Sequence, residues 1–245
     1  MNILKSEKLK LKKSGVLSIS IVTPFICALF STLFGGSYNA SFQTIYWWMG
    51  IFLYLLFELI IYRNFMLEEK ASKFYNLKST NFKQNRIYLC KEVWTIYYGF
   101  IATLVMIGVL FFVRWSMPTN EIFNNSFHII LGLILIFISA VWMVPAFILL
   151  SNRINGLLII LFNFIITLLL APLVAISKLF FLLPYTYPYK IAKYFFRIKE
   201  AGDILDRAIT NQDKIELTIG LLLSLALFFI LNVIILRRKE NGKTY

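Results

Sequence analysis

Charged side chains are scarce in this chain of 245 residues: they make up 15% of it, whereas hydrophobic residues make up 59%. A typical soluble domain is about one-quarter charged and lacks repeated apolar runs near 20 residues in length. The shortage of charge therefore excludes an ordinary soluble globular domain and indicates a protein embedded in a membrane.

Metal ligands and catalytic motifs are also in short supply. His128 is the single histidine, which excludes a metal site built from several histidines. Cys27 and Cys90 fall in an apolar run and in a charged stretch, and these different depths disfavour a disulfide between them. The chain has no G-x-x-x-x-G-K-[ST], G-x-S-x-G or H-E-x-x-H motif. We therefore predict no catalytic residue, metal site or cofactor on this chain, and no enzyme activity of its own.

Six apolar runs organise the chain, each near the roughly 20 residues that a helix needs to cross a bilayer. They cover residues 15–34, 44–62, 93–113, 127–150, 157–176 and 215–236. No soluble domain flanks them, so we predict a single transmembrane domain over residues 1–245. The predicted fold is all-α, a polytopic membrane protein with six transmembrane helices.

The distribution of Lys and Arg predicts the orientation of these helices. The segment before the first run, residues 63–92, residues 151–156 and the segment after the last run together hold 17 of the 25 Lys and Arg residues. Cytoplasmic segments of membrane proteins carry such an excess, so we expect both termini in the cytoplasm. The same distribution explains the net charge of +13 better than nucleic-acid binding does, because the positive residues flank apolar runs.

The N-terminal segment, residues 3–14, has a modest amphipathic pattern. One side of a helix there would carry Ile3, Leu4 and Leu11, and the other side Lys5, Lys12 and Lys13. Two interpretations stay open: a short helix lying on the inner leaflet, or a solvated basic tail that only orients the first span.

The charged stretch at residues 63–92 contains the best-formed amphipathic helix on the predicted cytoplasmic face. Its apolar stripe consists of Leu67, Ala71, Phe74 and Tyr75, and its charged rim includes Glu68 and Glu69. An apolar stripe rimmed by charge is typical of a helix that docks in a partner's groove. The alternative is that the stripe packs on the inner helix ends of this protein itself.

The longest segment on the predicted outer side is residues 177–214. Apolar residues recur at helical spacing from Ile191 to Ile198 and again from Ala201 to Ile209. We therefore predict two short amphipathic helices at the outer interface, after a bend at residues 184–189.

Two ionisable residues lie within or beside the apolar runs. Glu58 is expected about one turn inside the inner end of the second span, where a carboxyl group is a candidate functional site. The alternative, which we favour, is that Glu58 reaches the inner headgroups or pairs with a neighbouring cation. His128 begins the fourth span, and we expect an interfacial residue there instead of a ligand or proton carrier.

Three stretches carry a resemblance to a known family: ILKSEKLKLKKS (residues 3–14), EEKASKFYNLKST (residues 68–80) with Lys91 at the next helix start, and LPYTYPYKI (residues 183–191). Together with six spans and a long outer segment before the last span, they resemble the ABC-2 type permease subunits of ABC exporters. More closely, the chain is similar to the small permeases of lantibiotic self-immunity exporters and related bacterial peptide-toxin exporters.

This resemblance implies a half-transporter in the bacterial cell membrane. Two permeases, identical or paired with a sister subunit, would sit on two copies of a separate P-loop ATPase that binds ATP and Mg²⁺. A coupling helix over residues 67–77 would dock on the ATPase through Leu67, Glu68, Glu69, Ala71, Phe74 and Tyr75. The outer segment would cap the path, with a gate region at Pro184, Tyr185, Tyr187 and Pro188. The implied cargo is a cationic or amphipathic antimicrobial peptide, expelled from the membrane or the cell to give immunity.

Two other function classes are compatible with the same hydropathy pattern. The first is a non-transporting membrane protein, an immunity protein or scaffold that sequesters a peptide toxin. The second, a secondary transporter, is disfavoured because Glu58 is the single carboxylate well inside a predicted span.

Overall fold

The computed structural model describes residues 3–12, 14–35, 40–72, 84–116, 125–151, 153–205 and 207–237. Within these ranges the chain is predominantly helical and has no strand; an isolated bridge joins Ile198 to Ile204. The all-α fold predicted from the hydropathy pattern is therefore confirmed.

Six helical segments are long and apolar enough to cross a membrane. They extend over Val16–Gly35, Ala40–Glu69, Asn85–Ser116, Ser126–Ser151, Gly156–Ile176 and Asn211–Arg237. Each matches one of the six runs predicted from the sequence. The second span ends at Glu69 instead of residue 62, and the third begins at Asn85 instead of residue 93.

Three of the spans are continuous helices and three are interrupted. The continuous ones are α2 (Val16–Gly35), α6 (Gln84–Ser116) and α12 (Asn211–Arg237). The second span joins α3 (Ala40–Trp47) to α4 (Leu53–Ser72) through a π-helical turn at Trp48–Phe52. The fourth joins α7 (Ser126–Ala140) to α8 (Met143–Ser151), and the fifth joins α9 (Gly156–Ile165) to α10 (Ala171–Ile176) through a second π-helical turn at Ile166–Leu170.

A proline explains where one of these interruptions falls. The break between α7 and α8 lies at residues 141–142, just before Pro145, which has no N–H to donate and whose ring crowds the preceding turn. Pro24 lies inside α2 without ending it, as membrane helices tolerate.

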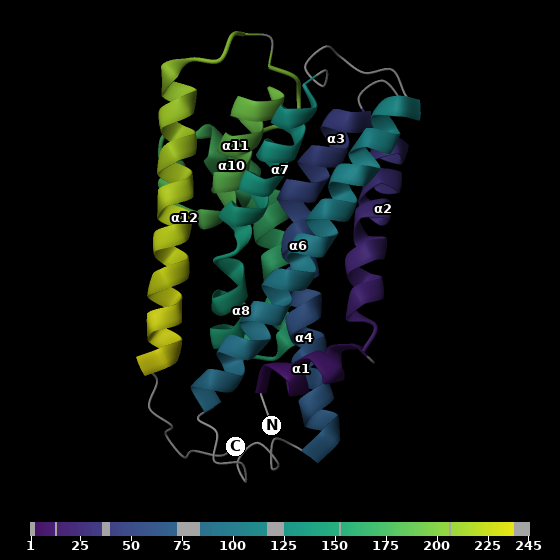
Figure 1. The fold of residues 1–245 in the computed structure, drawn as a ribbon. Helices are drawn as coiled ribbons and strands as arrows, with labels where there is room; N and C mark the ends of the chain where they lie inside the picture. Colours follow the sequence, from purple (N-terminus) through teal and green to yellow (C-terminus); the bar gives the residue numbers. More distant parts are fainter. Residues whose placement is uncertain are drawn as a thin grey trace.

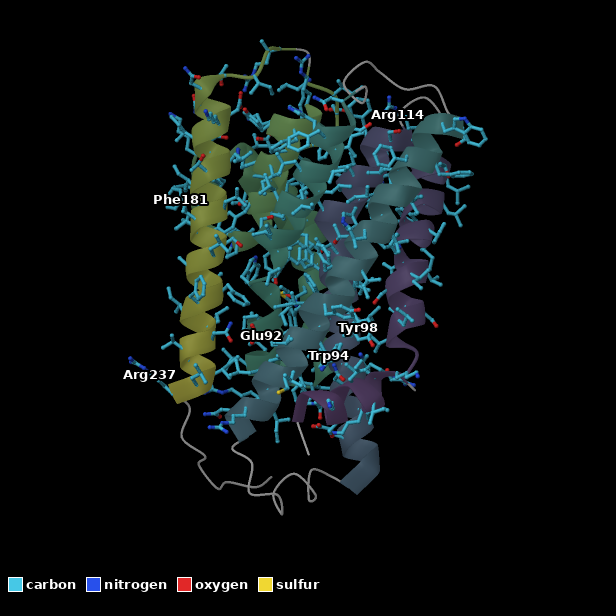
Figure 2. The ribbon with its side chains drawn as sticks, in the orientation of Figure 1. Glu92, Trp94, Tyr98, Arg114, Phe181 and Arg237 are labelled. Atoms are coloured by element: carbon cyan, nitrogen blue, oxygen red, sulfur yellow. The ribbon has the colours of Figure 1, made fainter. Side chains whose placement is uncertain are left out.

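The helices stand side by side, and α1 (Ile3–Lys12) lies across one end of them (Figure 1). The start of the chain at α1 and the end of α12 at Arg237 lie at this same end, which we name the α1 end (Figures 1 and 2). The span from Ala40 to Glu69 is the most buried: 72% of its apolar stretch lies inside the structure, whereas the corresponding share for α12 is 17%. Thus α4 is central, and α12 presents most of its apolar surface outward.

Close helix packing depends in one place on the absence of a side chain. A Cβ at Gly132 of α7 would lie 2.5 Å from Cζ of Phe196 in α11 (Tyr187–Phe196), so only glycine lets α11 approach this closely. As a result α11 packs against α7 and α12, with eight of its ten residues buried. This helix belongs to the bundle, and the prediction that it lies on the outer interface is wrong.

The second helix predicted for the outer segment, Ala201–Ile209, is not formed by the described residues of that stretch. After α11 ends, Arg197 adopts a left-handed conformation with φ of 52°, and Gly202 follows with φ of 95°. The described residues from 197 to 210 form turns and extended chain, in which Leu205 is buried and Ala201 and Ala208 are exposed. Positive φ values interrupt a right-handed helix, so the apolar spacing in this stretch does not correspond to one helical face.

Candidate functional site

Glu58 lies deep inside the bundle, on α4. Because α4 continues to Ser72 and the span continues to Glu69, Glu58 is about three helical turns from the α1 end of the span. Its side chain is 1% exposed. The prediction that Glu58 lies one turn from the end and reaches the headgroups is therefore wrong.

Polar side chains from three elements gather around Glu58. Tyr54 precedes it by four residues on α4 and shares its face, while Asn163 on α9 and Thr167 on the second π-helical turn stand opposite. A narrow recess separates these groups. Its walls are Ile51, Tyr54, Leu55, Glu58, Asn163, Phe164 and Thr167, and the space between them is too small for an ordered water.

Tyr185 connects this recess to the predicted gate region. Its hydroxyl donates a hydrogen bond to Asn163 Oδ1. Burial and the nearby charge of Glu58 raise the pKa of Tyr185, so the hydroxyl keeps the proton that it donates. The structure thus brings together Glu58 and Tyr185, which the sequence suggested as parts of two separate sites.

Three buried polar atoms in this cluster have no close hydrogen-bond partner, although the Glu58 carboxyl interacts with the side chain of Asn163 and the Tyr54 hydroxyl with that of Trp142. They are Glu58 Oε1, Tyr54 Oη and Asn163 Nδ2. No Lys or Arg in the described part of the chain forms an ion pair with Glu58, so the predicted pairing with a neighbouring cation is not observed. An unpaired carboxyl group in an apolar interior carries a large free-energy penalty, which makes this position the strongest candidate for a functional site.

A second charged cluster lies at the α1 end, where it holds α1 against the bundle. Lys91 of α6 is 1% exposed, and its Nζ lies 2.7 Å from Glu68 Oε1 and 3.4 Å from Glu7 Oε2. Lys10 of α1 binds Glu7 at 2.6 Å. Partial burial would lower the pKa of Lys10, but the hydrogen bond and charge of Glu7, together with Glu68, raise it.

Backbone contacts complete the attachment of α1. The Trp94 indole donates a hydrogen bond to the Leu4 carbonyl at 3.1 Å, and Arg63 Nε donates to the Ser14 carbonyl at 3.2 Å. Figure 2 shows Trp94 at the level of α1. Leu11 is buried on the bundle side, whereas Leu4 is 39% exposed, so the buried face of this helix differs from the predicted one.

The predicted docking residues have different surroundings. Leu67 is partly buried, Glu68 is buried in the cluster with Lys91, and Glu69 is exposed. These residues continue α4, so they begin no separate helix. The side chain of Ala71 and the whole of Phe74 and Tyr75 lie outside the described residues.

A pocket of about 360 Å³ opens beside this segment at the α1 end. One wall comes from the last turns of α4, and the other from α8 and the turn before α9. The lining residues are Tyr62, Phe65, Met66, Glu69, Phe147, Ser151, Ile154, Asn155 and Gly156. Glu69 of the predicted coupling segment thus lines the same pocket as Ser151 and the residues from Ile154 to Gly156, where α9 begins.

A third charged cluster lies at the opposite end and joins α11 to α12. Lys190 Nζ is 2.9 Å from both Glu200 Oε1 and Glu216 Oε2, and Lys193 contacts Glu200 at 3.1 Å and Asp213 at 3.3 Å. Burial would raise the pKa of Glu200, but hydrogen bonds from Lys190 and Lys193 lower it below its ordinary value.

The remaining gate residues lie close to this third cluster. Pro184 and Tyr185 form a short 3₁₀ turn with Thr186, and Tyr187 and Pro188 begin α11. All three of Tyr185, Tyr187 and Pro188 are buried, and the Tyr187 hydroxyl donates to the Phe181 carbonyl at 2.9 Å.

Sequence reasoning missed several polar residues that the structure brings together. Asn163 could have been recognised from the sequence, because it is the single Asn in the apolar run at 157–176. Glu92 was assigned to a loop, yet it is buried in α6 and accepts a hydrogen bond from Asn232 Nδ2 of α12 at 2.8 Å. Nothing in the sequence pairs these two positions, which are far apart along the chain.

His128 and the cysteines show no sign of a metal site. His128 is exposed at the start of α7, with its ring 5.5 Å from that of Phe195. Cys27 and Cys90 are both free thiols. Within the described ranges, no group of three or more His, Cys, Asp and Glu residues could hold a metal ion.

Comparisons with known proteins identify no relative. No family model, no curated protein and no solved structure matches this chain. The structure itself shows that six helices are long and apolar enough for a multi-pass membrane protein. Polar clusters lie at both ends of the bundle and in its interior.

Proposed function

We propose that this chain is the permease subunit of an ATP-driven exporter that removes antimicrobial or amphipathic peptides from the membrane or cell. Two such permeases would form a dimer. ATP and Mg²⁺ would bind to a separate P-loop ATPase, because the chain has no phosphate-binding motif of its own.

The observation that carries this proposal is the pocket at the α1 end. Its walls include Phe65, Met66 and Phe147, and Glu69 stands at its edge with an exposed side chain. An apolar floor with a polar rim is the shape that accepts an apolar projection from a partner protein. Glu69 of the predicted coupling segment and the turn before α9 both line the pocket, so one partner surface could contact them together.

The packing of the surrounding helices gives such a contact a route into the bundle. α4 extends without a break from Glu69 and Tyr62 in the pocket wall to Glu58 in the recess. Displacement of the lower part of a continuous helix is transmitted along its axis, since its hydrogen bonds resist stretching. A partner that docks at the pocket is therefore placed where it can affect the interior of the bundle.

Co-purification with an ATPase tests the proposal. The full chain, solubilised in detergent, should retain a P-loop ATPase encoded beside it and stimulate its ATP hydrolysis. Ile154→Asp, in the pocket wall, and Phe74→Asp, in the predicted coupling segment, should each weaken the complex by about tenfold. Ala201→Asp is the matched control, because Ala201 is exposed at the opposite end.

Two results would contradict the proposal in different ways. A chain that purifies alone and stimulates no ATPase is not a permease of this type. Protection against a peptide that persists when the ATPase is catalytically inactive would instead indicate a non-transporting immunity or scaffold protein.

A further inference from the structure

We propose that the recess at Glu58 is a binding site for a primary ammonium group, carried by the lysine side chain of a membrane-embedded amphipathic peptide. This inference deepens the proposed function and rests on it for the identity of the peptide. The binding chemistry itself follows from the residues of the recess.

The first argument is the missing counter-charge. Two other buried charges in this protein have counter-charges, since Lys91 lies between two carboxylates, as does Lys190. Glu92 is intermediate, because Oε1 accepts a hydrogen bond from Asn232 while Oε2 has no partner among the described residues. Glu58 is as buried as Lys91, at 1% exposure, but its Oε1 has no partner among the described residues. A positive group from another molecule would supply the charge that the recess lacks.

The second argument is the set of acceptors around the recess. An ammonium group has three donors and no acceptor. Glu58 Oε1 and Tyr54 Oη have no close hydrogen-bond partner, and Thr167, whose hydroxyl donates to the Asn163 carbonyl, also lines the recess. These residues can offer oxygen acceptors to an ammonium group, and the carboxylate supplies the charge.

The third argument is the size of the space. The recess is too narrow for a water molecule as it stands, so its walls must move apart before any group enters, and a compact group requires the smallest displacement. An ammonium group is a compact charge on a flexible apolar stem, whereas the guanidinium of arginine is a broad plane. The narrowness therefore favours lysine over arginine as the group that enters.

The fourth argument is that the walls can yield. Ile51 and Thr167 belong to the two π-helical turns, which contact one another across the recess. Such turns are rare and often occur at functional sites. Phe164, also in the wall, is 42% exposed on the outside of the bundle, so rotation of its ring would open the recess sideways between α4 and α9.

The test uses the purified full chain in lipid nanodiscs without an ATPase. The probe is a fluorescent, apolar helical peptide with one central lysine, and the reference is the same peptide with norleucine in place of lysine. Fluorescence anisotropy gives the two affinities. We expect the native protein to prefer the lysine peptide by about tenfold or more, and Glu58→Gln to abolish that preference.

Glu92→Gln is the matched control, since Glu92 is also a buried carboxylate but has a partner in Asn232. It should leave the preference for lysine unchanged. Glu58→Asp keeps the charge and should retain a reduced preference, which provides a second measurement if Glu58→Gln does not fold.

The inference is overturned if the native protein binds both peptides equally, or if Glu58→Gln keeps the preference for lysine. This outcome is distinguishable from failure of the proposed function. Loss of preference with an intact ATPase complex leaves a permease whose cargo is recognised elsewhere. A preference for lysine without any ATPase complex leaves the ammonium site on a protein that sequesters its peptide.

Discussion

Lys91 and Glu58 are equally buried, each 1% exposed, but their surroundings differ. Lys91 lies within 3.4 Å of two carboxylates, Glu7 and Glu68, which come from different helices. Glu58 has no described cation beside it and keeps an unpartnered oxygen. The charges of the cluster at the α1 end are paired with one another, whereas the recess at Glu58 contains no counter-charge from the described residues.

We interpret this difference as the one between a structural charge and a candidate functional charge. A buried charge that is fully paired fixes the position of the helices that supply its partners, here α1, α4 and α6. A buried charge without partners weakens the fold and is retained for another reason, which in membrane spans is usually recognition or transport. Four predictions test this distinction.

Removing Lys91 should have the largest effect. Lys91→Met leaves Glu7 and Glu68 buried with only the half-buried Lys10 beside them, and uncompensated buried charges of this kind cost about 3–5 kcal/mol. The measurement is the free energy of unfolding, by titration with a denaturing detergent in mixed micelles. Lys5→Met, an exposed position on α1, should change it by less than about 0.5 kcal/mol. Equal effects of both substitutions would show that the cluster does not hold α1.

Removing the partner of Glu92 should have an intermediate effect. Asn232→Leu leaves the Glu92 carboxyl without its hydrogen bond, at a cost of about 1–3 kcal/mol, and so makes Glu92 resemble Glu58. The same titration measures it, with Val233→Leu on the exposed side of α12 as control. An Asn232→Leu protein as stable as the control would mean that this hydrogen bond contributes nothing.

Acid should weaken the ion pairs that Glu200 forms with Lys190 and Lys193, at the end of the bundle opposite α1. The pKa of Glu200 is lowered in the folded protein, so its ion pairs stabilise the fold above the ordinary value near 4.5 and lose that effect as pH falls through the lowered pKa. Glu200→Gln should therefore reduce stability at pH 7 by about 1 kcal/mol and have no further effect near pH 2. Thermal unfolding of both proteins from pH 7 to pH 2 measures the difference. A gap between them that is constant with pH would contradict the assignment.

Removing the charge of Glu58 should change stability least of all. Glu58→Gln deletes a carboxyl group that no described cation compensates, so we expect a change within about 0.5 kcal/mol or a slight gain. Detergent titration beside Lys91→Met makes the comparison direct. A loss similar to that of Lys91→Met would mean that Glu58 is a structural charge after all.

Hydropathy was sufficient to predict the six spans, but it misplaced the ends of two of them. Arg63, Glu68, Lys91 and Glu92 are charged, and so the sequence pattern assigned them to a loop in water. In the structure they lie in α4 and α6, and three of the four are buried. Their partners lie on other segments, among them α1, α12 and, for Glu68 and Lys91, each other's helix. A hydropathy average along one segment contains no information about such partners.

The outer segment shows the opposite error. Helical spacing of apolar residues continued past Phe196, but the chain reverses at Arg197 and Gly202. Short apolar patterns of this kind do not distinguish a helix from turns that bury single residues. The same limit explains why α11 was predicted at the interface, although its lysines Lys190 and Lys193 are neutralised within the bundle.

The sequence by itself determined that this protein is a bundle of apolar helices, because apolar length and charge scarcity are local properties of the chain. Only the tertiary structure decided which of its few charges are paired. Pairing depends on side chains that meet from helices remote in the sequence, as Glu7, Glu68 and Lys91 do, and as Glu58, Asn163 and Tyr185 do around the recess. Because the dielectric constant of the interior is low, a buried polar side chain with a partner stabilises the fold, and one without a partner is costly. The presence or absence of a partner therefore decides which buried residue is the candidate site.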